Sequence, residues 1–374
     1  MAAQPEDVVE TVTFTLDGEQ ITAFEGETIL QAADREGLGT QVPRLCYTEG
    51  QRPVGNCRSC MVEIEGERAL APSCWRLPKE GMVIRSGSER ARASQKMVLE
   101  LLQSDMPETT YSPDSELEYW VQEFNIGTPR FESRNQPTAD LSHPAMAVNL
   151  DACIQCTRCV RACREEQVND VIGFAFRGDQ AEIVFDLNDP MGESSCVACG
   201  ECVQACPTGA LMPANGVGLV EEEKKVDSVC PYCGVGCQLQ YNIKDNRILH
   251  IEGRDGPSNH ERLCVKGRYG FDYVNHPNRL TKPLIRREGV NKELHGDFDP
   301  ARPEEIFREA SWEEALDMAA TGLITLKAEQ GPQALAGFGS AKCSNEEAWL
   351  FQKLIRTGFG SNNVDHCTRL CHAS

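Results

Sequence analysis

The chain has 374 residues, 19 cysteines and a formal net charge of −20 at pH 7. Its length predicts roughly two to four domains, and its acidic charge argues against nucleic acid and anionic membranes as partners. It has no apolar run of about 18 residues that would span a membrane and no signal-like N-terminus, so we expect a cytoplasmic protein with reduced cysteines.

The first predicted domain covers residues 8–85. Residues 11–16 alternate like a strand, Asp17-Gly18 predicts a hairpin turn, and residues 20–24 give the second strand. A short helix is expected over residues 27–36.

Four cysteines follow this helix with the spacing C-x10-C-x2-C-x13-C: Cys46, Cys57, Cys60 and Cys74. A zinc ribbon is the alternative, which the long first gap and the preceding hairpin disfavour. The arrangement resembles the β-grasp [2Fe–2S] ferredoxin domain, in the variant found in the large Fe–S subunit of complex I and in NAD-linked hydrogenases and formate dehydrogenases. The resemblance implies one [2Fe–2S] cluster bound by these cysteines.

Residues 86–145 are predicted to form a helical connector and a linker. Ser86 and Glu89 fit a capping box, and the helix should run to about Ser104. Its buried stripe is predicted to consist of Met97, Val98, Leu101 and Leu102.

A cluster site of the resembling families is missing from this connector. In those families the helix is often followed by Asp-His-Pro and three cysteines, but Met106 stands at the histidine position here, and no cysteine or histidine occurs from Glu108 to Trp120. We therefore expect no cluster in this segment. Residues 128–150 are rich in Pro, Ser and Asn and indicate a linker with a solvated His143.

The third predicted domain covers residues 146–215 and contains the motif C-x2-C-x2-C-x3-C twice. This spacing is typical of [4Fe–4S] clusters, with the fourth cysteine of each motif serving the other cluster. Two complete copies disfavour a zinc site or disulfides. The predicted sets are Cys153, Cys156, Cys159 and Cys206 for one cluster, and Cys196, Cys199, Cys202 and Cys163 for the other. A hairpin over residues 171–176 and 181–185 is expected to cover the clusters.

Residues 224–283 carry the spacing C-x2-C-x3-C-x26-C in Cys230, Cys233, Cys237 and Cys264. Alternating residues around an Asp245-Asn246 turn predict a hairpin there. The segment resembles the N-terminal [4Fe–4S] domain of molybdopterin oxidoreductases, which implies a third [4Fe–4S] cluster. The resemblance also places Lys266 between cluster and pterin; a plain surface lysine is the alternative.

Residues 284–374 predict the start of an α/β domain. Ser311 and Ser344 begin capping boxes for two helices, and residues 333–337 indicate a buried strand between them. The arrangement resembles the start of a pterin-binding domain.

The last residues resemble the active-site loop of cytoplasmic formate dehydrogenases. This resemblance makes Cys371 a ligand of molybdenum or tungsten and His372 the group that assists proton removal. A zinc pair of Cys367 and Cys371 is the alternative. We interpret Cys343, Cys367 and His366 as packing residues.

Together these elements predict an α+β multidomain protein that resembles the N-terminal part of the alpha subunit of NAD-dependent formate dehydrogenases. The resemblance implies oxidation of formate to CO2 at a molybdenum or tungsten bis(molybdopterin guanine dinucleotide) site. One [2Fe–2S] and three [4Fe–4S] clusters would carry the electrons to a partner subunit that binds flavin and NAD. Family members continue for several hundred residues, so we expect the chain as given to be inactive alone.

Two other functions remain open from the sequence. One is an electron-transfer subunit without an active site of its own, as in complex I or hydrogenases. The other is a nitrate reductase-like molybdopterin oxidoreductase, which Cys371-His372 disfavours by family resemblance.

Overall fold

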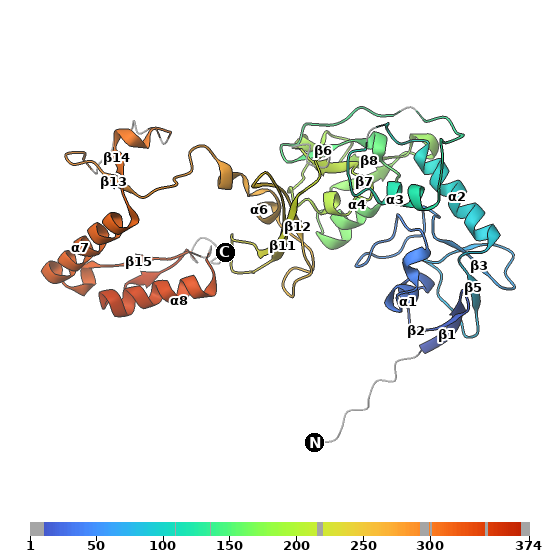
Figure 1. Ribbon diagram of the computed structural model, residues 1–374, viewed down its shortest axis with the longest axis horizontal. Coiled ribbons are helices and arrows are strands. Elements are labelled where there is room, and N and C mark those ends of the chain that lie inside the picture. Colours follow the sequence, from blue (N-terminus) through green and yellow to red (C-terminus); the bar gives the residue numbers. More distant parts are fainter. Residues whose placement is uncertain are drawn as a thin grey trace, which may run out of the picture. The chain divides into compact units, whose positions relative to one another are not determined.

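The computed structural model describes residues 11–108, 110–134, 136–214, 220–291, 299, 301–340 and 343–367. The chain divides into two compact units, Met1–Glu222 and Glu223–Ser374. In Figure 1 the first unit runs from blue to green and the second from yellow to red. Within the described ranges, no helix is both long and apolar enough to cross a membrane.

The first unit begins with a five-stranded sheet of strand order β2-β1-β5-β3-β4. An antiparallel hairpin forms its edge, with Asp17 and Gly18 at positive φ in the turn, so the predicted hairpin is confirmed. β1 pairs in parallel with β5. The strands are β1 (Thr11–Leu16), β2 (Glu19–Phe24), β3 (Met61–Ile64), β4 (Ala71–Pro72) and β5 (Val83–Arg85).

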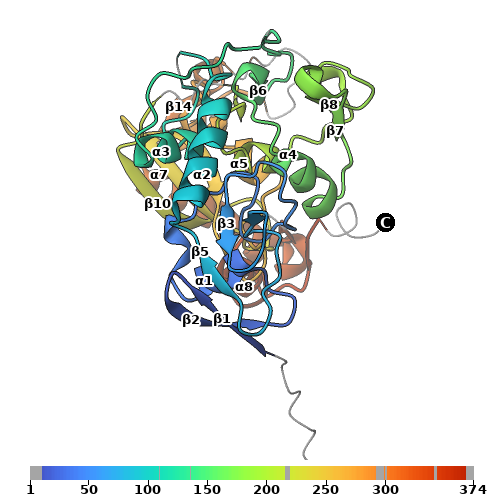
Figure 2. The same ribbon diagram turned by 90° about the vertical axis from the view of Figure 1, so that its right-hand side faces the viewer.

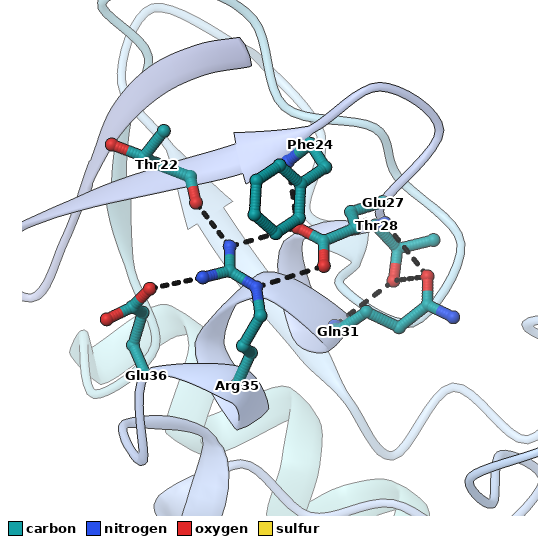
Figure 3. A network of polar contacts seen from close by, with 7 residues as sticks. All are labelled: Thr22, Phe24, Glu27, Thr28, Gln31, Arg35 and Glu36. Atoms are coloured by element: carbon teal, nitrogen blue, oxygen red, sulfur yellow. Dashed lines mark hydrogen bonds and ion pairs between the residues drawn. The ribbon is translucent and has the colours of Figure 1, made fainter. Parts of the chain in front are cut away.

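Helix α1 (Ile29–Arg35) begins at a capping box formed by Thr28 and Gln31, two residues inside the predicted start. Arg35 at its end contacts the Glu27 carboxylate at 3.1 Å, donates to the Thr22 carbonyl and lies over the Phe24 ring. Figure 3 shows this network. These contacts of Arg35 link the end of α1 to β2. The apolar face of α1 packs in the same buried core as the sheet.

The connector helix α2 (Glu89–Gln103) ends where the sequence predicted, but two details of that prediction are wrong. Its N-cap is Ser88, whose side chain accepts from the Ala91 N–H at 3.2 Å. Its buried residues are Ala91, Gln95 and Leu99, whereas Met97 is 41% and Leu101 45% exposed.

The partners of α2 explain this face. The helix packs against β3 and against α3 (Glu116–Glu123), as Figure 2 shows. Gln95 is fully buried there because its Nε2 donates to the carbonyls of Met61 at 2.8 Å and Ser86 at 3.2 Å. Residues four apart share a helix face, so this anchor turns Ala91 and Leu99 inward with it.

Residues near the end of the predicted linker 128–150 form a β-strand. β6 (Met146–Val148) pairs with β9 (Leu211–Pro213) and ties the two ends of the cysteine-rich segment together. The prediction of a solvated His143 is wrong, because this residue is 6% exposed and its Nδ1 accepts from the Ala145 N–H at 3.1 Å. Burial lowers the pKa of His143.

The cysteine motifs of the first unit form two short helices, α4 (Arg158–Arg161) and α5 (Glu201–Gln204), which contact each other. Between them, β7 (Ile172–Ala175) and β8 (Glu182–Phe185) make the predicted hairpin, with a 3₁₀ turn at Gly178–Gln180. That hairpin prediction is confirmed.

The second unit begins with a three-stranded antiparallel sheet of β10 (Lys224–Val229), β11 (Gln238–Lys244) and β12 (Arg247–Gly253). Asp245 and Asn246 both have positive φ, which confirms the predicted turn. Helix α6 (Val265–Tyr269) contacts β12. The buried core of this domain includes Cys230 together with apolar side chains of β11 and β12.

The remaining elements of the second unit expose most of their apolar side chains. Helices α7 (Trp312–Gln330) and α8 (Asn345–Lys353) begin at the predicted caps, Ser311 and Ser344, but neither has a buried residue. The predicted strand at 333–337 is shorter, because Pro332–Ala334 forms a 3₁₀ turn that leaves β15 with Gly337–Phe338. β13 (Leu284–Arg286) pairs with β14 (Phe307–Glu309), and β15 with β16 (Val364–Asp365).

Candidate iron–sulfur and pterin sites

The four cysteines of the first domain come together at the ends of β3 and β4 and in the loop before them. Cys46, Cys60 and Cys74 are buried and Cys57 is half-buried. The Cys46 N–H donates to Cys57 Sγ at 3.4 Å. Hydrogen bonds from the thiols of Cys57 and Cys74 lower the pKa of Cys46 to about 2, and a thiol hydrogen bond from Cys74 lowers that of Cys60. The four sulfurs therefore converge, as a [2Fe–2S] cluster requires.

Local hydrogen bonds hold these cysteine loops in place. Ser59 Oγ donates to the Pro43 carbonyl at 3.3 Å, and Ser73 Oγ donates to the Cys60 carbonyl at 2.9 Å. Arg58, between Cys57 and Cys60, has the left-handed φ of 64°. A residue with left-handed φ can turn successive backbone N–H groups toward the same side of the loop, and these N–H groups favour an anion on that side.

The eight cysteines of the third domain line two separate cavities. The first is lined by Cys153, Cys156, Cys159 and Cys206, and the second by Cys163, Cys196, Cys199 and Cys202. Each cavity thus combines three cysteines of one motif with the fourth of the other. This grouping has the crossed pattern that the sequence predicts.

The two motifs share one backbone conformation. Gln155 and Thr157 have φ values of 48° and 61°, and Ala198 and Gly200, at the same positions of the second motif, have 55° and 75°. The Ala198 N–H donates to Cys196 Sγ at 3.3 Å. Non-glycine residues in this region are strained, and the strain is typical of functional loops that aim N–H groups at an anion.

Burial disfavours the charged thiolate form of these cysteines. It raises the pKa of Cys153 to about 11 and of Cys156 to about 12, and it raises the pKa of Cys159 well above its ordinary value. A thiolate is the metal ligand, so iron is the partner that would compensate the buried charge. In the described part of the chain no three His, Cys, Asp or Glu side chains gather as for a single metal ion; in a cubane each cysteine binds its own iron.

Two arginines of α4 that the sequence analysis did not single out reach into the first domain. Arg158 donates to the Leu45 carbonyl at 3.3 Å and pairs with Glu116 at 2.7 Å. Arg161 donates to the carbonyls of Cys46 and Arg52. Comparison of the two motifs could have revealed them, because the second motif has Glu201 and Gln204 at these positions.

The third cysteine set lies closer to the surface. Cys230 is buried and Cys237 half-buried, whereas Cys233 and Cys264 are exposed. Burial raises the pKa of Cys230 and Cys237, and the charges of the other cysteines of the set add to this rise. The four predicted ligands are therefore close enough to interact.

Lys266 is exposed and lies beside this third set. Its Nζ is 6.0 Å from the centre of the Tyr232 ring, in the loop between Cys230 and Cys233. The Tyr232 hydroxyl donates to the Gly270 carbonyl just after α6. The structure thus places the lysine next to the candidate cluster loop.

The predicted metal ligand Cys371 and its neighbour His372 lie outside the described residues. Of the predicted packing residues, Cys343 is half-buried and donates from Sγ to the Ser340 carbonyl at 2.9 Å. Cys367 is also half-buried. His366 is exposed, so its interpretation as a packing residue is wrong; the strand β16 before it has a partner on only one side.

Four family models match the chain in succession. Residues 9–89 match a 2Fe-2S iron-sulfur cluster binding domain, and residues 152–210 match a 4Fe-4S dicluster domain. Residues 223–276 match the molybdopterin oxidoreductase Fe4S4 domain, and residues 279–374 match molybdopterin oxidoreductase.

Curated relatives match nearly the whole chain. It is 32% identical to "Putative formate dehydrogenase SH0748" of Staphylococcus haemolyticus, over 97% of this chain and 40% of that protein. It is 33% identical to "Probable oxidoreductase YjgC" of Bacillus subtilis, over 96% of this chain and 39% of that protein. The chain thus spans about two fifths of the length of these relatives.

A solved structure is similar to part of the chain. It is the crystal structure of an NAD+-reducing [NiFe]-hydrogenase, with a TM-score of 0.50 and 28% identity, covering 54% of this chain and 87% of that one. Together with the family models, these matches show a multidomain α+β chain built from a [2Fe–2S] domain, a [4Fe–4S] dicluster domain and the Fe–S and molybdopterin domains of the molybdopterin oxidoreductases.

Proposed function

We propose that this chain carries the electron relay and part of the pterin domain of the catalytic subunit of a formate dehydrogenase. In the proposed reaction formate is oxidised to CO2, and the electrons reach a partner subunit that binds flavin and NAD. The main support for the electron relay is the pair of cavities, each lined by three cysteines of one motif and the fourth cysteine of the other. Relatives named as formate dehydrogenases support the substrate, and a solved NAD+-reducing hydrogenase supports the final acceptor.

The roles of the chain's own residues follow from their surroundings. When bound, the clusters carry single electrons and a molybdenum or tungsten pterin supplies the oxidation chemistry. Sixteen cysteines in four sets would hold the clusters, and the apolar surroundings of the first three sets exclude water. Cys371 would bind the metal, His372 would take up a proton on its imidazole, and Lys266 would lie between cluster and pterin.

The [2Fe–2S] site is proposed to exchange electrons with the first [4Fe–4S] site. One apolar core contains Cys46, Cys60 and Cys74 of the first site and Cys156 of the second. Apolar residues of the connector, including Leu99 and Trp120, complete this core. The connector therefore supplies packing at the place where the sequence lacks ligands for a further cluster.

An electron-transfer subunit without its own active site is the second candidate. It is supported by the similarity of 54% of this chain to a chain of the NAD+-reducing hydrogenase. The two functions differ in what Cys371 does. The cytoplasmic location predicted from the sequence stays a prediction.

The test uses the complete subunit purified with its partners under anaerobic conditions. We expect molybdenum or tungsten in the preparation, formate-dependent reduction of NAD, and bleaching of the cluster absorbance by formate. Cys371→Ala should abolish bleaching by formate and leave bleaching by dithionite unchanged. The 374-residue chain alone should respond only to dithionite. Bleaching by formate in the Cys371→Ala variant would contradict the proposal.

A further inference from the structure

Arg161 bridges the two candidate cluster sites of the first unit. Its Nη2 donates to the Cys46 carbonyl at 2.5 Å and to the Cys156 carbonyl at 3.4 Å. Its Nη1 donates to the Arg52 carbonyl at 2.8 Å. Cys46 belongs to the [2Fe–2S] set and Cys156 to the first [4Fe–4S] set. One guanidinium therefore contacts the backbone of a ligand from each site.

This guanidinium is a buried charge. Arg161 is 3% exposed, and an arginine stays protonated in proteins. Among the described residues no carboxylate lies within ion-pair distance of it; Glu165, which acts on it from farther away, pairs with Arg52 at 2.8 Å. Arg158, by contrast, has Glu116 at 2.7 Å. A buried charge without a counter-charge is costly.

We infer that Arg161 is the shared counter-ion of the [2Fe–2S] site and the first [4Fe–4S] site, and that it raises the reduction potential of both. This inference rests on the cysteine sets of the proposed function. Four thiolates make each occupied site negative, and one added electron makes it more negative. A nearby buried cation therefore stabilises the reduced form. Moving one electron from one site to the other leaves the total charge beside Arg161 unchanged.

The internal repeat provides a matched control. The first motif reads Cys159-Val-Arg161-Ala-Cys163, and the second reads Cys202-Val-Gln204-Ala-Cys206. The two segments differ only at the central residue, yet both end at a cysteine that lines a cavity. An arginine is therefore not required to build the motif. The charge is present only in the motif that contacts the [2Fe–2S] domain.

Arg161→Gln tests the inference because it makes the first segment identical to the second. The 374-residue chain, anaerobically reconstituted, is titrated with dithionite and redox mediators and followed by electron paramagnetic resonance. We expect the [2Fe–2S] site and one [4Fe–4S] site to lose at least tenfold in the ratio of reduced to oxidised form, a shift of about 59 mV toward negative potential. Arg161→Lys keeps the positive charge, so both potentials should stay close to those of the unmodified chain. Gln204→Arg should leave the [2Fe–2S] potential unchanged.

Unchanged potentials in an Arg161→Gln variant with full iron content would overturn the inference, as would a shift at one site only. If Arg161→Gln loses iron, the Arg161→Lys variant decides the question. Potentials of Arg161→Lys near those of the unmodified chain support a charge effect, and a tenfold loss in the ratio of reduced to oxidised form at both sites refutes it. The measurement needs neither formate nor pterin, so it is independent of the formate reaction. An unmodified chain without a [2Fe–2S] signal would refute the ligand sets and the inference together.

Discussion

The two units of the chain treat their candidate cluster sites differently. In the first unit the twelve predicted ligands are buried or half-buried, and they line apolar cores and cavities. In the second unit two of the four predicted ligands, Cys233 and Cys264, are exposed. Helices α7 and α8 of that unit have no buried residue, and Trp312 is 69% exposed.

The difference indicates where each unit obtains its stability. The first unit encloses its predicted ligands in an apolar core and two cavities, so we expect it to fold and to bind its clusters without the second unit. Large apolar side chains of α7 and α8, among them Trp312, Ile324 and Trp349, are exposed and give these helices an apolar surface, and large surfaces of this kind mark interaction sites. We expect that surface to be covered by a further part of a pterin domain. Changes that remove a ligand or a buried side chain should therefore act most strongly in the first unit.

The largest effect is expected from single cysteine variants of the crossed sets. Cys206→Ala should remove the cluster held by Cys153, Cys156 and Cys159, and Cys163→Ala should remove the other one, because each cavity contains the fourth cysteine of the opposite motif. Iron analysis should show a loss of about four irons in each variant. Cys343→Ala in the second unit is the control and should lose none. Loss of the cluster of its own motif in either variant would contradict the crossed pairing.

A buried and an exposed tryptophan should differ in their contribution to stability. Trp120 is 8% exposed and packs edge-to-face on Phe124, with ring centres 6.1 Å apart. Trp120→Ala should lower the free energy of unfolding by about 3–5 kcal/mol. Trp349 is 60% exposed, so Trp349→Ala should change it by no more than about 0.5 kcal/mol. Denaturant titrations of the first and second units measure this, and equal costs at the two positions would refute the contrast.

Helix caps should show no difference between the units. Ser88 accepts from the Ala91 N–H at 3.2 Å, and Ser311 accepts from the Glu314 N–H at 3.1 Å. Because a cap is a local interaction, Ser88→Ala and Ser311→Ala should each cost about 1 kcal/mol. Replacement by Gly should cost only a few tenths of a kcal/mol. A cost confined to Ser88→Ala would show that α7 is not stably folded in the second unit.

The smallest expected effect is a pH dependence from the surface of α2. Two hydrogen bonds from Arg130 lower the pKa of Glu100 to about 2. A carboxyl whose pKa is depressed on folding adds stability above its unfolded value of about 4.3, and this stability is lost as the pH falls toward 2. Glu100→Gln should make the unfolding midpoint depend less on pH over this range. An unchanged slope between pH 4.5 and about 2 would exclude the pair as its cause.

Sequence reasoning succeeded where the signal is local. The hairpin at Asp17-Gly18 and the starts of α7 and α8 depend on turn and cap residues that lie next to each other in the chain. The cysteine spacings likewise identified the sets that line each cavity. These features need no knowledge of distant contacts.

Sequence reasoning failed where a distant partner decides the outcome. Gln95 is buried because it donates to Met61 and Ser86, and a polar residue carries no sign of this in a hydrophobic pattern. His143 is buried at a place where the chain backbone lies close to Gly192, about fifty positions further on. Arg161 contacts residues more than a hundred positions away. Such contacts arise only when the domains pack.

The central claim is that the chain binds four clusters, three of them within the first unit. Anaerobic reconstitution followed by iron analysis and Mössbauer spectroscopy tests it most directly. We predict about 14 irons in the 374-residue chain, from one [2Fe–2S] and three [4Fe–4S] clusters, and about ten in residues 1–222 alone. About 18 irons with a fourth cubane, or a first unit that binds fewer than about ten, would contradict it.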